Sequence, residues 1–329
     1  MRYVARSPTK RDILWHTRMP RDDSGRLLGA HGVRHDLRET VLERLGLGAP
    51  PACDIAGLQA VYAAWCQRVP FDNVRKLIAL RTDPPATPLP GLDSSDFFAT
   101  WRDHGAGGTC WASSNALHGL LRALGFDARR IAGSMRDTGL ITHGSVLVHI
   151  GDDDWLVDTS MLTEAPLPVR GVYHLHRDDP FVAEIEPLDG AMFLLWTRMP
   201  SSDSYLPCRF LVDPDTYEAH VERYALSRHV GGFNQRVYAR RNRDGEQWML
   251  SGPAFTVRSA SGIATRELAP GELIELLHDE FGMSDEILTR FIDCGALVES
   301  YAPLAVTPPP LSGLPPSLRR RVGQHDLEG

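Results

Sequence analysis

The spacing of apolar residues predicts that the first part of the chain is helical. Apolar side chains recur at helical intervals before Gly46, which ends that pattern. Asp54 is suited to cap a second helix, and Gly125 to end a later one that carries a clear apolar stripe. The expected helices are a first one between residue 39 and Gly46, a second following Asp54 through residue 65, one around 97–101 and one over 113–124.

Strand patterns dominate from about residue 128 onward. Residues 144–150 are apolar and β-branched, the aspartates at 152–154 supply a turn, and 155–158 resume the pattern. Asp244-Gly245 is typical of a hairpin turn because this pair tolerates positive φ. Helices then follow Pro270 and Ser284, so the order indicates an α+β fold. The expected strands are 128–135, 144–150, 155–158, 208–212, 235–240, 247–250 and 254–258.

Composition narrows the class of protein. The 329 residues are 43% hydrophobic, enough for a large core, and carry a net charge of −7. That charge argues against nucleic-acid binding, which needs clustered positive side chains. No apolar run approaches the ~18–20 residues that span a bilayer, and the first residues lack the apolar stretch of a secretory signal. We therefore expect a cytoplasmic protein with no membrane partner.

The five cysteines are scattered and odd in number, with no Cys-x-x-Cys pair. This spacing argues against a disulfide framework and against a structural metal site. In a reducing compartment, each cysteine is either a small buried hydrophobe or a nucleophile.

Cys110 has the sequence context of a nucleophile. It follows Gly107-Gly108-Thr109 and stands directly before a predicted helix. The unpaired N–H groups and dipole at a helix start favour the thiolate, which is the reactive form. The glycines let a substrate or another backbone segment approach closely. From this local sequence alone, a buried structural cysteine remains the commoner alternative.

His143 and Asp158 are the candidate partners of that cysteine. A nucleophilic cysteine needs a base, and the base needs an acceptor that orients it. If strands 144–150 and 155–158 form a hairpin, His143 and Asp158 become neighbours at one edge of the sheet. His149 is a rival base near the turn, at the far end of the hairpin. His143 as a polar strand end and Asp158 as a cap remain open alternatives.

Several motifs then resemble the arylamine N-acetyltransferase family. The segment 106–111, Ala-Gly-Gly-Thr-Cys-Trp, is similar to the family motif Arg-Gly-Gly-Tyr-Cys-Phe. Val-Pro-Phe-Asp-Asn at 69–73 is similar to the family's Pro-Phe-Glu-Asn, and residues 268–282 resemble a helix of its third subdomain. The family's active site is a Cys-His-Asp triad in the chain order found here. The resemblance covers about residues 39–295.

The resemblance implies a papain/transglutaminase-like catalytic core within an α+β fold of three subdomains. By this expectation a helical bundle carries the cysteine, a β-barrel carries the histidine and aspartate, and an α/β subdomain forms a lid. The implied parts are an irregular arm at 1–38, the bundle at 39–127, the barrel at 128–230, the lid at 231–300 and a Pro/Arg-rich tail at 301–329.

It also implies a ping-pong acyl transfer without a permanently bound cofactor. The catalytic residues would be Cys110, His143 and Asp158. The implied donor is an acyl-CoA or a carrier-protein acyl thioester, which would make an acyl carrier protein a partner, and the implied acceptor is a small-molecule amine. The candidate substrate-binding residues are Phe71, Thr109, Trp111 and Thr159, although Phe71 and Trp111 equally suit core packing.

The chain departs from the family pattern after Asp158. Thr159-Ser160-Met161-Leu162 stands where family members have Val-Gly-Phe-Gly, so a specialised donor fits at least as well as acetyl-CoA. Residues 155–159 also resemble strand ends of transglutaminase-like and cysteine-peptidase-like hydrolases, which share the triad order. Such a hydrolase, and a binding module that retains the fold without catalysis, are the alternative hypotheses.

Overall fold

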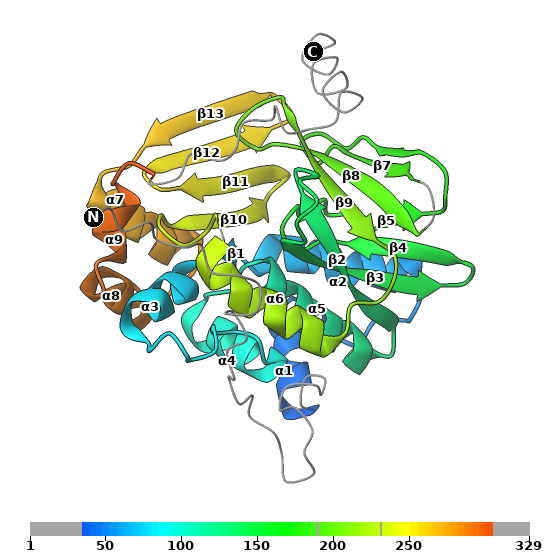
Figure 1. Cartoon of the computed structure of the whole chain (residues 1–329), viewed down its shortest axis with the longest axis horizontal. Coiled ribbons are helices and arrows are strands. Elements are labelled where there is room, and N and C mark those ends of the chain that lie inside the picture. The colour runs from blue at the N-terminus through cyan, green and yellow to red at the C-terminus, as the bar shows by residue number, and fades with distance from the viewer. Residues whose placement is uncertain (1–34, 189–190, 231, 305–329) are drawn as a thin grey trace, which may run out of the picture.

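The computed structural model describes residues 35–188, 191–230 and 232–304 (Figure 1). The predicted arm at 1–38 and tail at 301–329 therefore lie almost entirely outside the described residues. Mixed helices and antiparallel sheets confirm the α+β class. The helices are α1 His35–Arg44, α2 Ile55–Arg68, α3 Val74–Thr82, α4 Ser94–His104, α5 Cys110–Leu124, α6 Tyr217–Val230, α7 Pro270–Glu275, the π-helical turn η1 Leu276–Glu280, α8 Asp285–Asp293 and α9 Ala296–Ser300.

The helical region forms around an aromatic core. Asp54 caps α2 by accepting the Gly57 N–H at 2.8 Å, and Gly125 ends α5 with a φ of +99°. Trp65 of α2 stacks on Phe97 of α4 at 5.9 Å between ring centroids. Trp65 and Phe97 share one buried cluster with Leu117 of α5, and burying each such side chain contributes about 1.5–3 kcal/mol.

An eight-stranded antiparallel sheet curls beside α5 into a nearly closed barrel (Figure 1). Strands from the two ends of its order come into contact, and β2 and β3 pack on α5. The predicted hairpin is present, with Val146 opposite Val157. In the order β5-β4-β3-β2-β9-β8-β7-β6, the strands are Leu167–Val169, Asp153–Val157, His143–Ile150, Asp127–Met135, Tyr205–Leu211, Met192–Arg198, Ala183–Pro187 and His174–His176.

A second antiparallel sheet, in the order β1-β10-β11-β12-β13, forms the other half of the upper layer in Figure 1. Its first strand belongs to the helical region, so the sheet is joined to that region through a main-chain ladder. Helices α7 and α8 pack with it in a separate hydrophobic core. The strands are β1 Phe71–Asp72, β10 Tyr238–Arg243, β11 Glu246–Ser251, β12 Ala254–Ser259 and β13 Gly262–Glu267.

Three sequence predictions need correction. The strand expected at 235–240 begins at Tyr238, because Gln235 and Arg236 bond instead to carbonyls of the C-terminal segment. The helix expected from residue 113 begins at Cys110. Helix α6 lies inside the proposed barrel segment 128–230. It was not predicted, because its buried positions include His220 and two tyrosines rather than an apolar stripe. The other elements that the sequence analysis missed are β1, β5, β6, β7, β8, β13, α3 and α9.

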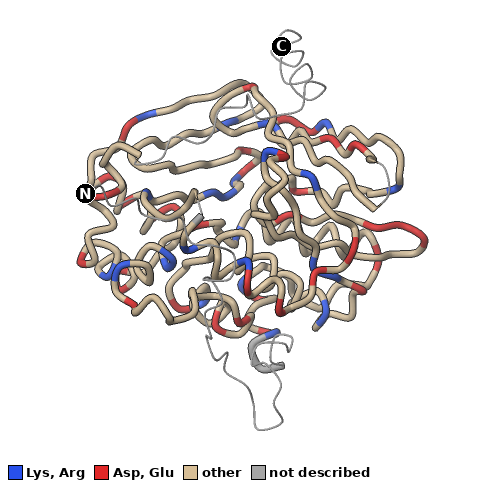
Figure 2. Tube along the Cα trace, viewed as in Figure 1, with Lys and Arg blue, Asp and Glu red and all other residues tan. Residues whose placement is uncertain are grey.

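Charges of both signs are interspersed along the described chain, and the acidic tip of the β3–β4 hairpin projects at the right of Figure 2. Among the described residues, no helix has the length and apolar character needed to cross a bilayer.

Candidate active site

The elbow before α5 is held in place by Asp72. One carboxylate oxygen of Asp72 accepts the Gly107 N–H at 2.6 Å and the other accepts the Val74 N–H at 2.9 Å. Burial raises the pKa of Asp72 to about 6, although the two N–H donors oppose that rise. A Cβ on Gly107 would lie 1.9 Å from the carbonyl oxygen of Pro70, so only glycine fits here.

Asn73, the next residue, holds the segment that enters the second sheet. Its amide donates to the carbonyls of Phe233 and Arg236 at 3.1 and 2.8 Å, and its oxygen accepts the Tyr238 N–H at 2.8 Å. Phe71 is buried with its ring against Phe233 and Tyr238. The Phe-Asp-Asn motif thus ties the elbow before α5 to the start of β10.

Cys110 is the first residue of α5, and Thr109 stands before it in an extended conformation. The cysteine is 7% exposed, and its sulfur lies 3.9 Å from the carbonyl oxygen of Thr142. Thr142 immediately precedes His143, so the sulfur contacts the residue that leads into β3.

His143 and Asp158 form a buried pair across the open end of the β3–β4 hairpin. Nε2 of the imidazole lies 2.7 Å from Oδ2 of Asp158. The second oxygen of Asp158 accepts the N–H groups of Ser160 and Met161, both at 2.9 Å. The Tyr62 hydroxyl donates to the Asp158 carbonyl at 2.7 Å. Every acceptor of this aspartate is therefore occupied, which fixes its orientation.

His143 and Asp158 each stabilise the charged form of the other. Burial alone would lower the pKa of His143, but the charge and hydrogen bond of Asp158, together with a hydrogen bond and charge from Cys110, raise it to about 10. Burial would raise the pKa of Asp158, yet the interaction with His143 and the two N–H donors keep it below its usual value. The arrangement thus favours an imidazolium beside a carboxylate and a sulfur, as a thiolate nucleophile requires.

His149, the rival base, lies elsewhere. It is paired with Asp154 across the hairpin near the turn, and its Nδ1 lies 3.2 Å from a carboxylate oxygen of that residue. The side chain is exposed, so the structure brings it near neither Cys110 nor Asp158.

Trp111 packs within the core behind the nucleophile. Its ring meets His220 edge-on at 4.9 Å, and its carbonyl is 2.7 Å from Nε2 of His220. A Cβ on Gly144 would lie 2.7 Å from the Trp111 ring. Of its two suggested roles, the geometry therefore supports core packing. The sequence analysis did not single out His220, because it lies on a helix that the apolar pattern did not predict.

Thr109 and Thr159 are both buried near the first turn of α5. The Thr159 hydroxyl lies 2.8 Å from that of Ser113, which also donates to the Thr109 carbonyl. After Thr159 the chain turns sharply, and Leu162 adopts a φ of +53° at a position where the family motif has glycine. The carbonyl of Leu162 accepts the amide of Asn242 at 2.7 Å, which holds this turn against β10.

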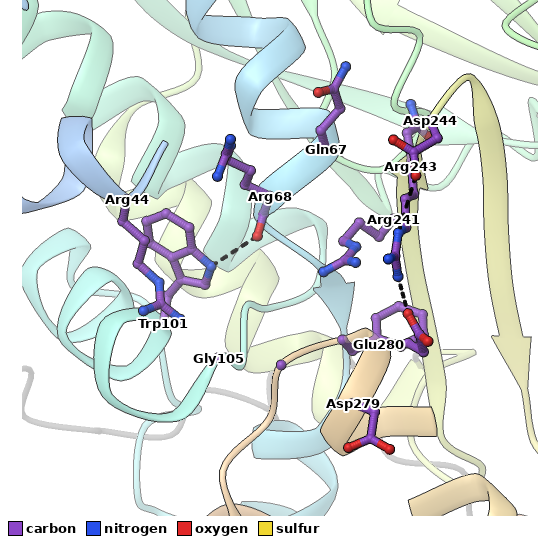
Figure 3. Close-up of a pocket in the computed structure, with 13 residues that line it drawn as sticks. Arg44, Gln67, Arg68, Trp101, Gly105, Arg241, Arg243, Asp244, Asp279 and Glu280 are labelled. Atoms are coloured by element: carbon purple, nitrogen blue, oxygen red, sulfur yellow. Dashed lines mark hydrogen bonds and ion pairs between the residues drawn. The ribbon is translucent and has the colours of Figure 1, made fainter. Parts of the chain in front are cut away.

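A separate cleft of about 480 Å³ lies between α2, α4, β10 and η1 (Figure 3). Neither Cys110 nor any of the predicted substrate-binding residues lines it. Among the described residues, no group of three or more His, Cys, Asp or Glu side chains is arranged to hold a metal ion.

Comparisons with known proteins identify the family of this chain. A family model described as N-acetyltransferase matches residues 54–287. Proansamycin X synthase from Amycolatopsis mediterranei is 31% identical over 126 residues, which are 36% of this chain and 46% of the relative. An arylamine N-acetyltransferase from Mycolicibacterium smegmatis is 32% identical over 92 residues, which are 28% of this chain and 31% of the relative. The aligned parts thus span less than half of either curated relative.

Solved structures share the fold. An arylamine N-acetyltransferase from Mycobacterium smegmatis superposes with a TM-score of 0.68 and 20% identity, covering 81% of this chain and 98% of that one. The Mycobacterium marinum enzyme in complex with CoA gives a TM-score of 0.67 and 18% identity, covering 79% and 97%.

Proposed function

Since this chain belongs to the N-acetyltransferase family, we propose that it is an N-acyltransferase that passes an acyl group from a thioester through Cys110 to an amine. The observation that carries the proposal is the buried His143–Asp158 pair, whose histidine follows the residue that contacts the Cys110 sulfur. In this proposal Asp158 is a positioning residue, because it acts through His143 rather than on the substrate.

In the first half-reaction, the Cys110 thiolate attacks the thioester carbonyl of the donor. The new C–S bond forms as the donor's C–S bond breaks, and His143 gives its proton to the departing thiolate. The enzyme then carries the acyl group on Cys110, with a neutral imidazole beside it.

In the second half-reaction, an amine attacks the acyl-enzyme. His143 takes the proton that the nitrogen loses, the amide forms, and Cys110 leaves as the thiolate next to an imidazolium. The pKa of His143, raised to about 10, suits the return of this resting pair. If water replaced the amine, the same steps would constitute a hydrolase.

Two donor classes are compatible with the comparisons. The similarity to proansamycin X synthase favours an amide synthase with a specialised donor, and the fold shared with a CoA-bound relative favours acyl-CoA. Met161 and Leu162, both buried, occupy the positions after Asp158 where family members have Phe and Gly. Because Leu162 is bulkier than the glycine that it replaces, the test includes donors other than acetyl-CoA.

The test offers acetyl-CoA and acyl carrier-protein thioesters to the protein in parallel, without amine. We expect a mass increase of one acyl group that maps to the peptide containing Cys110, with the productive donor identifying the class. Adding an arylamine or another primary amine should discharge it as amide. Labelling at Cys53 instead, or discharge to free acid at the same rate with and without amine, would contradict the proposal.

A further inference from the structure

Three arginines of the cleft in Figure 3 lack an anionic partner. Arg44, Arg68 and Arg241 come from α1, α2 and β10, and none of them forms an ion pair with an acidic residue in the described part of the chain. Arg75, by contrast, forms an ion pair with Asp96. These three arginines thus line one cleft without an ion pair of their own, although the charge of Asp103 acts on Arg44 and opposes the lowering of its pKa by burial.

Arg241 is the most constrained of the three. It extends from β10 toward the side of the cleft that carries Arg44, Arg68 and Trp101 (Figure 3). Its Nε is buried and has no hydrogen-bond partner among the described residues. Burial and the neighbouring charges of Arg243 and Arg68 lower the pKa of Arg241, although Glu280 and Asp244 oppose this. An unpaired, partly desolvated guanidinium is costly unless an anion compensates it.

The walls hold the other two arginines in place. Arg44 lies over the ring of Trp101 at 5.1 Å from the centroid. The Arg68 guanidinium lies against Gly46, where an added Cβ would come within 2.9 Å of it. Gly46 also has a φ of +72°, so a side chain there is disfavoured by the backbone as well as by the arginine.

The acidic residues of the cleft pair with side chains other than Arg44, Arg68 and Arg241. Glu280 forms an ion pair with Arg243, and Asp279 lies 2.6 Å from Nδ1 of His278. Asp244 sits at the rim and is exposed, at 3.4 Å from Arg243. The positive charge without an ion pair is thus carried by Arg44 and Arg68 on the helical side and by Arg241 on the β10 side.

We propose that this cleft is a second ligand site, distinct from Cys110, which binds a phosphorylated small molecule with a phosphate group seated against Arg241 and Arg68. A guanidinium fork matches phosphate oxygens in two-point hydrogen bonds, and a phosphate offers more charge and more acceptor oxygens than a carboxylate. The volume of about 480 Å³ lies within the range of small-molecule pockets.

A ligand in this position would bridge two parts of the fold. The cleft is bounded on one side by α1, α2 and α4, and on the other by β10 and η1. These sides already meet where the Ser284 N–H donates to the carbonyl of His104, just before the elbow that leads to Cys110. Binding should therefore stabilise the docking of the second sheet on the helical region, because a ligand that binds only the folded state raises its stability.

The experiment is calorimetric titration of the full chain with inorganic phosphate, ADP, CoA and succinate, followed by thermal melts with the same compounds. We expect saturable one-to-one binding of at least one phosphate compound and weaker or no binding of succinate. Comparing ADP with CoA distinguishes a nucleotide that binds only in the cleft from an acyl donor that also binds at Cys110.

Arg241→Gln and Arg68→Gln should each weaken phosphate binding by about 10- to 100-fold, as expected for losing a charged hydrogen bond. Arg122→Gln is the matched control, since Arg122 pairs with Asp127 on the surface of α5 and its loss should leave binding unchanged. Circular dichroism checks that each variant is folded. The proposal is overturned if no phosphate compound saturates, if succinate binds equally well, or if both cleft variants bind like the control.

Discussion

Charge is arranged in opposite ways around Cys110 and in the arginine cleft. At the first site Asp158 has its oxygens filled by His143 and two backbone N–H groups, and all of these groups are buried. In the cleft, Arg68 and Arg241 have no carboxylate partner among the described residues and face a cavity. One site is complete within the protein, and the other is complete only with an anion.

The difference separates two kinds of function. A group that must transfer protons is best preorganised by the protein itself, since reorganisation during the reaction adds to the barrier. A group that must recognise a ligand is best left unsatisfied until the ligand arrives, because its desolvation is then offset by the new contact. On this basis we expect the two sites to respond independently to substitution.

The largest expected effect is that of Cys110→Ala. We expect no acyl group on the protein after incubation with a productive thioester, because Cys208, which packs against the β2 residue opposite His143, is fully buried and burial raises the pKa of its thiol. Phosphate binding in the cleft should persist with an unchanged dissociation constant by calorimetry. Cys53→Ala, an exposed cysteine, is the control and should acylate normally. Loss of phosphate binding in Cys110→Ala would mean that the cleft and Cys110 belong to a single site.

His143→Ala should slow acylation by about 10²- to 10⁴-fold, the usual contribution of a general acid–base group. The matched control is His149→Ala, which removes the same side chain at the other end of β3. Single-turnover acylation rates, followed by mass spectrometry, compare the two variants. If His149→Ala is the slower one, the base has been misassigned.

The contact between His143 and Asp158 was predictable because it depends on local patterns. A hairpin with His143 at the start of one strand and Asp158 just after the next must bring these residues together, and the register of β3 and β4 bears this out. The arginine cleft was not predictable in this way. Residues 44, 68 and 241 belong to three elements whose packing depends on long-range contacts, and β1, which links the helical region to β10, is only two residues long.

Helix α6 illustrates the same limit inside the candidate active site. Its buried side chains are Tyr217, His220, Val221 and Tyr224, so its buried face mixes polar and apolar groups. Apolar periodicity cannot detect such a face. His220 bonds to a carbonyl one residue from the nucleophile, and only the tertiary structure reveals that contact.

The pH dependence of stability should sharpen the contrast. The pKa of His143 is raised to about 10, whereas an unfolded histidine titrates near about 6.5. Between these values the folded state binds more protons, so this pair's stabilisation is complete below about pH 6.5 and is lost as pH rises toward 10.

Lys76 contributes in the opposite direction, because burial lowers its pKa to about 8. The midpoint of urea unfolding, measured from pH 6.5 to 10 in the wild type and in His143→Gln, isolates the histidine. We expect the advantage of the wild type to shrink as pH rises, and a constant or growing advantage would contradict the assigned pKa.

The smallest expected effect is that of Asp244→Asn at the rim of the cleft. Asp244 has a φ of +51° and precedes Gly245, and asparagine tolerates this conformation, so the β10–β11 turn should be kept. Removing a negative charge near Arg241 should tighten phosphate binding by about two- to fivefold at low salt, and the gain should fade as salt screens the charge. Asp152→Asn makes the same change at the distant β3–β4 tip. It should leave phosphate binding unchanged at low and at high salt. Tighter binding in both variants would mean that overall charge attracts the anion, whereas an effect confined to Asp244 locates the phosphate beside Arg241.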